Sequence, residues 1–273
     1  MREIKLIKYV RTPHLEGSRL QPGDEDLSQI PFSDIVGRYL VVEEKCDGAN
    51  TAISFDGVGN LLLQSRGHYL TGGWRERHYD LLKQWAGIHR DALYGVLGSR
   101  YIMYGEWMYA KHTVYYDRLP HYFLEFDILD RETGAFLDTP TRHEMLQNVP
   151  VVSVPVLAEG KFQDKEKLLQ LLGHSRYISG HHMEHLRDVS RRLKLDEDRQ
   201  CRETDPLPTM EGLYIKVEED GRVVDRMKYV RSTFYQAVQL SESHWLDKPI
   251  VPNRLAIPVD DLFLPALPGK ELT

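Results

Sequence analysis

Short turns rich in glycine and aspartate divide this sequence into pairs of apolar strands. Residues 51–55 (TAISF) and 61–66 (LLLQSR) are rich in β-branched and large apolar side chains, and the DGVGN between them has the composition of a hairpin turn. The same arrangement recurs at 210–231, where the turn DGR separates MEGLYIKVEE from VVDRMKYVR. Strands joined this tightly pair in antiparallel fashion, because a parallel crossover needs about a dozen residues or more. With helical segments elsewhere, these hairpins predict an antiparallel α+β fold.

The segments outside the two hairpins are expected to form further strands and helices. The same signals predict further elements, namely strands at 39–44, 100–109 and 121–130 and helices over 75–86, from near Thr139 and from Ser232. Residues 160–205 are polar, charged and helical in period, which is typical of an insert at the surface. We therefore expect one domain over residues 1–240, carrying that insert, and a short Pro-rich extension at 241–273.

Composition narrows the class of protein. With 41% hydrophobic residues among 273, the chain has ample apolar material for a buried core. No apolar run approaches the length of a membrane span, and the N-terminal segment lacks a signal peptide's apolar stretch. Cys46 and Cys201 do not suggest a disulfide scaffold, so we expect a cytoplasmic protein. The net charge of −6 excludes a protein coated in positive charge, but a narrow basic site can still hold nucleic acid.

Lys45 is placed unusually, at the point where a strand breaks into a glycine turn. Side chains alternate along a strand, so Glu43, Lys45 and Asp47 share one face. Gly48 permits a tight turn or the close approach of a ligand to the backbone. A lysine held in this way acts as a nucleophile only after losing its proton, and we expect nearby cations to lower its pKa. Taken alone, the motif favours a surface salt bridge to Glu43 or Asp47.

An ordered set of short motifs changes that interpretation. Lys45-Cys46-Asp47-Gly48 is followed by Ser65-Arg66, Tyr104-Gly105-Glu106, Phe126-Asp127, Glu211-Gly212-Leu213-Tyr214-Ile215-Lys216 and Arg226-Met227-Lys228. In this order the set resembles the covalent nucleotidyltransferase superfamily of ligases and capping enzymes. Within it, the sequence is most similar to ATP-dependent RNA ligases of the RNA ligase 2 kind, over roughly residues 40–231. The resemblance implies a nucleotidyltransferase (ATP-grasp-like) domain with antiparallel sheets and flanking helices.

The resemblance also implies a role for each matching residue. Lys45 would attack the α-phosphate of ATP and form lysyl–AMP, with Arg226 and Lys228 as its catalytic partners. Glu106 and Glu211 would hold Mg²⁺ or Mn²⁺. The nucleotide-binding residues would be Glu44, Asp47, Gly48, Asn50, Arg66, Glu106, Phe126 and Lys228. Arg226 departs from the lysine of the family motif, which keeps the charge but changes the geometry.

Elementary chemistry supports this assignment independently of the resemblance. Transfer to and from phosphorus needs cations around the developing negative charge and carboxylates that hold a divalent metal. An acid such as Glu106, inside an apolar strand, is costly unless it is paired or bound to metal. Other residues of the motif set can be explained without a functional site. Arg66 ends a hairpin, where arginines are usually solvated, and Phe126 lies at a strand position typical of a core residue.

The expected function is ATP-dependent joining of RNA 5′-phosphate and 3′-hydroxyl ends through lysyl–AMP and adenylylated RNA, with an end-healing enzyme as a compatible partner. A DNA or mixed nick-sealing ligase shares the motifs, but such enzymes normally carry an OB-type barrel after the last motif. We expect the Pro-rich segment after Arg231 to be too short for such a barrel, and this expectation favours RNA ligase. A non-catalytic protein that binds nucleic-acid ends is the alternative from another class.

Two features of the polar insert stay open at this stage. His181 and His185 lie four residues apart in HHMEH, a spacing that can bind metal, although histidines on a polar helix are usually just exposed. The same segment carries basic residues opposite an apolar stripe, namely Arg187, Arg191, Arg192 and Lys194 against Leu186, Val189 and Leu193. That pattern fits an ordinary amphipathic surface helix and a phosphate-binding face for RNA equally well.

Overall fold

The computed structural model of the chain describes residues 5–20, 24, 26–234 and 249–265. Its strands pair into one large, mostly antiparallel sheet, with helices packed around it, so the predicted antiparallel α+β class is confirmed. The strands are β1 (His14–Leu15), β2 (Gln29–Ile30), β3 (Tyr39–Lys45), β4 (Ala49–Phe55), β5 (Leu61–Ser65), β6 (Tyr101–Trp107), β7 (Phe123–Asp130), β8 (Phe136–Leu137), β9 (Val152–Ser153), β10 (Val156–Lys161), β11 (Gly212–Glu219) and β12 (Arg222–Val230).

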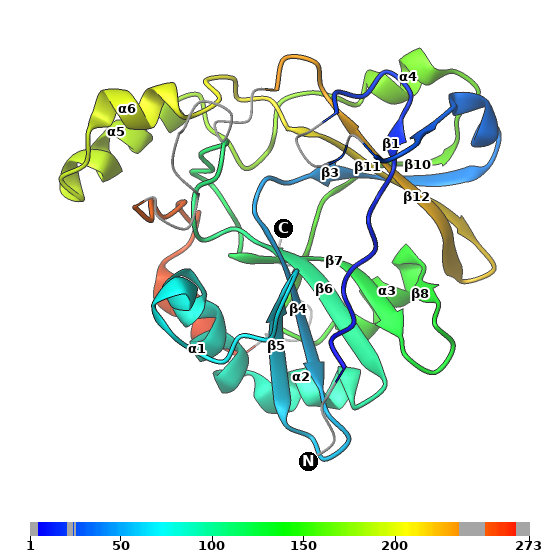
Figure 1. Cartoon of the computed structure of the whole chain (residues 1–273), viewed down its shortest axis with the longest axis horizontal. Helices are drawn as coiled ribbons and strands as arrows, with labels where there is room; N and C mark the ends of the chain where they lie inside the picture. The colour runs from blue at the N-terminus through cyan, green and yellow to red at the C-terminus, as the bar shows by residue number, and fades with distance from the viewer. Residues whose placement is uncertain (1–4, 21–23, 25, 235–248, 266–273) are drawn as a thin grey trace.

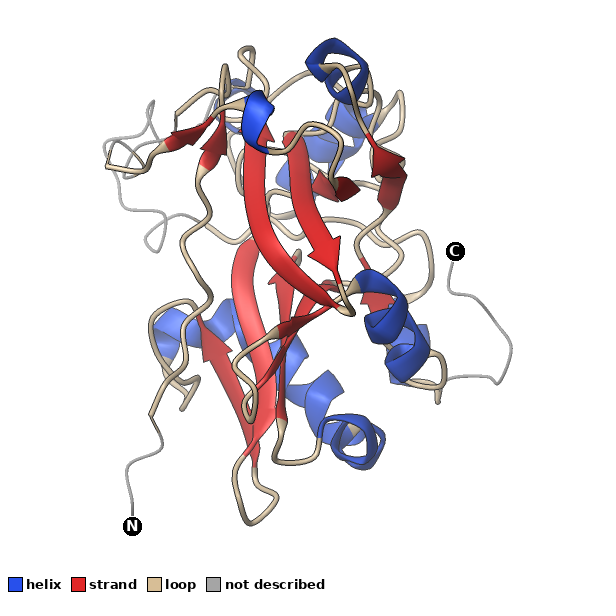
Figure 2. Cartoon of the chain, turned by 90° about the vertical axis from the view of Figure 1, so that its right-hand side faces the viewer, coloured by secondary structure: helices blue, strands red, loops and turns tan. Residues whose placement is uncertain are grey.

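The sheet has two halves that meet at a short strand. Hydrogen-bonded neighbours follow the order β10-β3-β11-β12-β8-β7-β6-β4-β5, so β8 joins the half containing β3, β11 and β12 to the half containing β4 to β7. Figures 1 and 2 show these halves one above the other. The chain passes directly from the first half to the second between Lys45, which ends β3, and Ala49, which begins β4. The turn singled out in the sequence therefore lies where the halves meet.

Helices cover the outer faces of both halves. They are α1 (Asp80–Ile88), α2 (Arg90–Leu97), α3 (Thr139–Leu146), α4 (Lys165–Leu169), α5 (His182–Arg192) and α6 (Glu197–Arg202), with 3-10 turns η1 (Phe32–Asp34), η2 (Trp74–Tyr79) and η5 (Val259–Phe263). Leu82 and Trp85 of α1 belong to the core cluster that includes Ile53 and Phe123 of the second half. Leu168 of α4 belongs to a separate cluster with strands of the first half. Each half thus buries its own apolar face.

Most of the local predictions are confirmed. Both hairpins form as expected, with β4 paired to β5 and β11 paired to β12. The α3 helix begins at Thr139, where the Asp138 side chain accepts a hydrogen bond from Thr141 N and Pro140 occupies the first turn. The helix expected over 75–86 is instead a 3-10 turn, η2, followed by α1, and α2 was not predicted. The helix expected from Ser232 falls mostly outside the described residues.

The segment expected to be a C-terminal extension contributes to the core. Leu255 and Leu262 belong to the same apolar cluster as the helices α1 and α2. His89 hydrogen-bonds the Leu262 carbonyl at 2.9 Å, and the Asn253 amide nitrogen donates to the Met108 carbonyl at 2.7 Å. Residues 249–265 are therefore an integral part of the body and not an appendage. Within the described parts of the chain, no helix has the length and apolarity that crossing a bilayer requires.

Candidate active site

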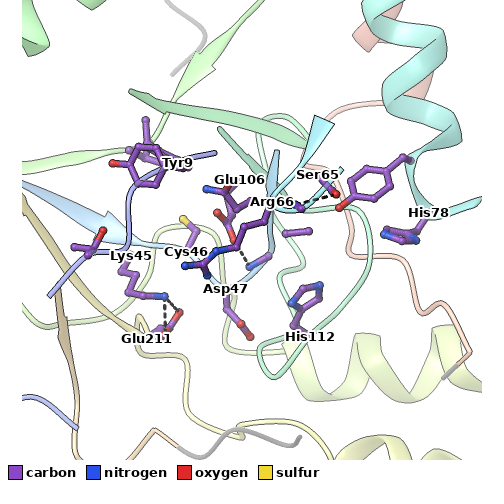
Figure 3. A pocket seen from close by; sticks show the side chains of 18 of the residues that line it. Tyr9, Lys45, Cys46, Asp47, Ser65, Arg66, His78, Glu106, His112 and Glu211 are labelled. Atoms are coloured by element: carbon purple, nitrogen blue, oxygen red, sulfur yellow. Dashed lines mark hydrogen bonds and ion pairs between the residues drawn. The ribbon is translucent and has the colours of Figure 1, made fainter. Parts of the chain in front are cut away.

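A cavity of about 1120 Å³ lies between the two halves of the sheet. It gathers nearly all the residues that the sequence motifs singled out, namely Glu44, Lys45, Asp47, Gly48, Asn50, Arg66, Glu106, Phe126, Glu211 and Lys228. They come from the ends of β3, β5 and β12, from β4, β6 and β7, and from the residue before β11. Figure 3 shows Lys45, Glu106 and Arg66 extending into the same space. Segments far apart in the sequence thus form one pocket.

Lys45 forms an ion pair with Glu211, whose carboxylate lies 2.7 Å from Nζ. Their proximity follows from strand pairing, because Lys45 is the register partner of Gly212. Burial alone would lower the pKa of Lys45, but the charges of Glu211, Glu106 and Asp47 outweigh it, so the pKa is raised. The expectation that neighbouring cations lower this pKa was therefore wrong for the protein alone: the groups closest to the amine are carboxylates.

The turn after Lys45 is held rigidly from both sides. The Asp47 carboxylate accepts hydrogen bonds from the backbone nitrogens of Thr113 at 2.7 Å and Val114 at 2.9 Å. Its own backbone nitrogen donates to the Tyr116 hydroxyl. Asp47 therefore organises the 113–116 loop, although it also lines the pocket. A Cβ at Gly48 would lie 2.8 Å from the Trp107 carbonyl oxygen, so close packing requires glycine here.

Glu106 is the most perturbed acid in the pocket. Burial, together with the negative charges of Glu211 and Asp47, raises the pKa of Glu106 to about 8, against the opposing charge of Lys45. The carboxylate also accepts a hydrogen bond from Gly48 N at 3.1 Å. A divalent cation would relieve this repulsion, and carboxylate oxygens are suitable ligands for Mg²⁺. In the described part of the chain no three acidic, histidine or cysteine side chains form a metal cage, so such an ion would need further oxygens from a substrate.

Two of the predicted catalytic cations lie in different surroundings. Lys228 lines the pocket and pairs with Asp24, and burial together with the charge of Lys45 lowers its pKa despite that partner. Arg226 is 9% exposed and does not line the pocket. Its guanidinium lies 3.3 Å from the Asp127 carboxylate and donates to the Tyr9 hydroxyl at 3.1 Å. Arg226 is thus placed behind the pocket wall, where it can position Tyr9.

One end of the pocket is aromatic. The rings of Phe126 and Tyr9 meet edge to face with centroids 5.1 Å apart, and Tyr214 lies beside Phe126 at 6.3 Å. All three residues line the cavity. The Phe126 carbonyl accepts a hydrogen bond from Lys216, which is buried and also contacts the Glu43 carboxylate. Such an end suits a flat apolar ring system of a ligand.

Glu44 and Asn50 occupy the pocket wall in different ways. The Glu44 side chain is 2% exposed, and burial raises its pKa to about 7 despite a hydrogen bond from Ser175 and the charge of Arg176. It pairs with Leu213 in β11, and its backbone nitrogen donates to the Pro155 carbonyl. Asn50 is the register partner of Glu106 on β6. Both residues therefore line the pocket, and their nucleotide-binding roles stay predictions.

Several residues that line the pocket were not predicted from the sequence. Tyr9 comes from the irregular N-terminal segment, His112 from the loop organised by Asp47, and His78 and Trp74 from η2. In Figure 3, Tyr9 lies on the same side of the view as Lys45, and His78 and His112 lie across from both. Burial lowers the pKa of each histidine to about 4, so both imidazoles are neutral. The only sequence signal for them was chemical type, since none belongs to a strand motif.

The histidines of α5 do not converge on a common centre. His185 Nδ1 lies 2.7 Å from the Asp117 carboxylate, and His181 Nδ1 lies 3.1 Å from Glu184. His182 is buried and hydrogen-bonds the Ser179 carbonyl. The sequence treated all three as exposed, which holds for His181 but is wrong for His182. Each histidine therefore has its own structural partner, and the partner of His185 lies outside the insert.

Comparisons with known proteins agree with this geometry. The profile of the RNA ligase family matches residues 38–230, and a search of curated proteins gives no match. Similar solved structures include two variants of the RNA ligase of Naegleria gruberi. One, with ATP and manganese, has 16% identity and a TM-score of 0.51 over 83% of this chain and 56% of that chain. The other, without ligand, has 15% identity and a TM-score of 0.52 over 82% and 56%.

An archaeal ATP-dependent RNA ligase is also similar, with 15% identity and a TM-score of 0.43 over 82% of this chain and 48% of that chain. This chain therefore spans about half the length of the solved ligases that it matches. At such low identity the two Naegleria structures support the fold alone, which is an α+β fold with a large, mostly antiparallel sheet. The family profile, however, covers well over half of the chain and includes every motif from Lys45 to Lys228. The chain belongs to the RNA ligase family.

Proposed function

We propose that this protein is an ATP-dependent RNA ligase that joins 5′-phosphate and 3′-hydroxyl ends. The observation that carries this proposal is the position of Lys45, whose amine faces a cavity between paired carboxylates, with Arg66 and Lys228 lining the same cavity. In the reaction, Lys45 Nζ bonds to the α-phosphorus of ATP and pyrophosphate leaves.

The shape of the pocket orients the nucleotide. The aromatic end formed by Phe126, Tyr9 and Tyr214 suits adenine, whose flat ring prefers to stack on or pack against other rings. The phosphates then extend past Lys45 toward Arg66 and the two neutral histidines. This direction brings the α-phosphate, the first after the ribose, closest to Lys45.

The amine must lose its proton before it attacks. The carboxylates that stabilise its charged form are Glu211 and Glu106, which are also the residues whose oxygens suit a divalent cation. Mg²⁺ or Mn²⁺ bound there would supply positive charge that neutralises both acids and polarises the phosphate. Glu211, at 2.7 Å, is the group that receives or shares the departing proton of Lys45.

Two further transfers complete the reaction. An oxygen of the RNA 5′-phosphate attacks the phosphorus of lysyl–AMP, and the Lys45 amine leaves and regains a proton. The 3′-hydroxyl then attacks the 5′-phosphorus, forms the phosphodiester and expels AMP. Arg66 and Lys228 would stabilise the charge that develops on the phosphoryl oxygens in these steps.

A panel of strands tests this function. The purified protein is incubated with ATP, Mg²⁺ and a nicked duplex carrying a labelled 5′-phosphate, and the 3′-hydroxyl strand is RNA in one set and DNA in another. The proposal expects sealing when the 3′-hydroxyl strand is RNA, and no sealing by Lys45→Ala. Sealing only of DNA would replace the RNA assignment with a DNA ligase. Binding of strand ends without any joined product on nicked, overhanging or single-stranded substrates would contradict ligase function.

A further inference from the structure

Most of the basic side chains of α5 are neutralised by neighbouring acids. Arg187 pairs with Asp198 of α6 at 3.0 Å. Arg191 pairs with Glu197 of α6 at 3.0 Å and with Asp188 at 3.2 Å. These arginines already have acidic partners. The interpretation that the whole basic face of this helix binds RNA phosphates is therefore not favoured. These pairs instead join α5 to α6, which lie side by side in Figure 1.

Arg192 differs from these neighbours. Its side chain is exposed and makes no ion pair or hydrogen bond that involves the described residues. It lines a second cavity of about 1130 Å³, formed between α5, the 109–122 segment and residues 252–259. Arg254, from the C-terminal segment, lines the same cavity and is likewise exposed. We call this cavity the arginine groove.

The two arginines converge although they are far apart in sequence. The backbone of Arg254 is fixed by hydrogen bonds, from its nitrogen to the Tyr116 carbonyl at 2.9 Å and from Leu119 N to its carbonyl at 3.0 Å. Burial, together with the charges of Asp117 and Asp188, raises the pKa of Tyr115 to about 12, and the charges of Arg254 and Arg192 oppose this increase. Both arginines and Tyr115 therefore line one groove.

The other charged groups of the arginine groove are already paired. Asp188 contacts Arg191, and His185 contacts Asp117. The pairing leaves the charges of Arg192 and Arg254 in excess, so the groove carries a net positive potential on a protein whose net charge is −6. A local positive site on an acidic body selects an anionic ligand. Guanidinium groups favour phosphate, which they can bind with two hydrogen bonds.

A single stretch of chain separates the arginine groove from the pocket that contains Lys45. Tyr109 and Tyr115 line the groove, and His112 lines the pocket. Asp47, two residues from Lys45, binds the backbone of Thr113 and Val114 within that stretch. A strand that leaves the pocket past His112 would meet Arg192 and Arg254 on the other side of this stretch.

We propose that the arginine groove binds the phosphate backbone of the RNA strand whose end lies in the Lys45 pocket. This inference rests on the proposed function, because it assigns part of the substrate of the same site. Two or more phosphates contact Arg192 and Arg254, while the pocket handles the terminal phosphate. The groove thus binds RNA through its phosphate charges and does not discriminate between bases.

The test compares exposed arginines of the same region. RNA binding is measured by fluorescence anisotropy with a labelled single-stranded RNA carrying a 5′-phosphate, over a series of salt concentrations. The variants are Arg192→Ala, Arg254→Ala and their combination, and Arg187→Ala serves as the matched control because it lies on α5 outside the groove. Formation of lysyl–AMP from ATP, which needs no RNA, is measured on each variant.

The combined variant is expected to bind RNA at least about tenfold more weakly at low salt, with a slope of log affinity against log salt reduced by about 1.4, since each lost phosphate contact on a single strand removes about 0.7. Its lysyl–AMP formation and that of Arg187→Ala equal wild type, and Arg187→Ala also binds RNA normally. Lysine at both positions restores part of the affinity. Unchanged RNA affinity and slope in the combined variant would overturn the inference.

Two other outcomes separate this inference from the proposed function. If wild type forms no lysyl–AMP but loses RNA affinity when the two arginines are removed, the ligase assignment fails and the groove assignment stands. If wild type seals RNA and the combined variant binds and seals it equally well, the groove assignment alone fails. Displacement of bound RNA by polyglutamate at equal charge concentration would overturn the assignment to RNA and indicate an acidic protein segment instead.

Discussion

The Lys45 amine and the Glu211 carboxylate are 2.7 Å apart, at the point where β3 ends beside the start of β11. Close strand packing produces this pair, because a Cβ at Gly212 would lie 2.0 Å from the Tyr229 carbonyl oxygen. Glycine at 212 therefore allows β11 to lie against β12 and sets Glu211 opposite the amine. In the protein alone this pair keeps the Lys45 amine charged.

Glu211→Gln removes the largest of the influences that raise the pKa of Lys45. The pKa is then expected to fall, because a close opposite charge that stabilises the protonated amine is lost. Acylation of Lys45 by a small reagent, followed by mass spectrometry across a pH series, measures this without ATP or metal. The exposed Glu184→Gln serves as the control and leaves the profile unchanged. An identical profile for Glu211→Gln would contradict the assigned cause.

The raised pKa of Glu106 predicts that a divalent metal releases a proton when it binds. Its pKa of about 8 means that the carboxyl is mostly protonated at pH 7. A cation must displace that proton, so affinity for Mn²⁺ in the presence of ATP should rise from pH 6 to about pH 8 and then level off. Calorimetry in two buffers of different ionisation enthalpy should detect close to one released proton per protein at pH 7. Glu106→Gln should weaken binding and lose the pH dependence; a buffer-independent enthalpy for wild type would contradict this account.

The position of Arg226 predicts that its replacement lowers the stability of the fold, and not primarily the formation of lysyl–AMP. Arg226→Ala removes an ion pair to buried Asp127, which keeps Lys216 at 3.4 Å as its other partner. Breaking a buried pair from one side is expected to cost about 3 kcal/mol of unfolding free energy, measured in urea. Arg226→Lys keeps the charge and should recover much of this loss. A variant that lost lysyl–AMP formation at wild-type stability would instead place Arg226 among the catalytic groups, as the motif implied.

Glu44 makes the stability of the fold depend on pH. Its pKa is about 7 in the folded protein and 4.5 ordinarily, so the folded state holds the proton more tightly than the unfolded chain. The stabilisation is full below about pH 4.5 and is lost as pH rises through 7, with a total near 3 kcal/mol. Glu44→Gln should therefore raise Tm relative to wild type at pH 8 and have little effect at pH 4.5. A Tm difference that is the same at both pH values would contradict this assignment.

The sequence was informative where the structure depends on local signals. Turn composition and alternation fixed both hairpins, because a two-residue period and a glycine turn are read directly from neighbours. The ordered motifs also identified Lys45, Glu106 and Glu211, which strand pairing then brings to one pocket. The pocket brings them together because each motif lies on or beside a strand whose type was clear, while their catalytic and metal-binding roles stay predictions.

Other features depend on contacts between distant segments, which a single sequence does not reveal. The sign of the pKa change at Lys45 was wrong because the sequence does not show that Glu211 is closer to the amine than Lys228 is. Tyr9 and His112 were missed because they lie in irregular segments placed by the fold. The sequence left two interpretations of the basic helix open. The structure shows that acids of α6 pair with Arg187 and Arg191, while Arg192 lines the arginine groove.

The covalent bond between Lys45 and AMP tests the central claim most directly. The protein is incubated with ATP and Mg²⁺, without RNA, and its intact mass and a labelled tryptic peptide are measured beside Lys45→Ala and Lys45→Arg. The account predicts one added AMP on wild type, located at Lys45, and none on either variant. Wild-type protein that stays unmodified, or an AMP adduct that persists in Lys45→Ala, would contradict it.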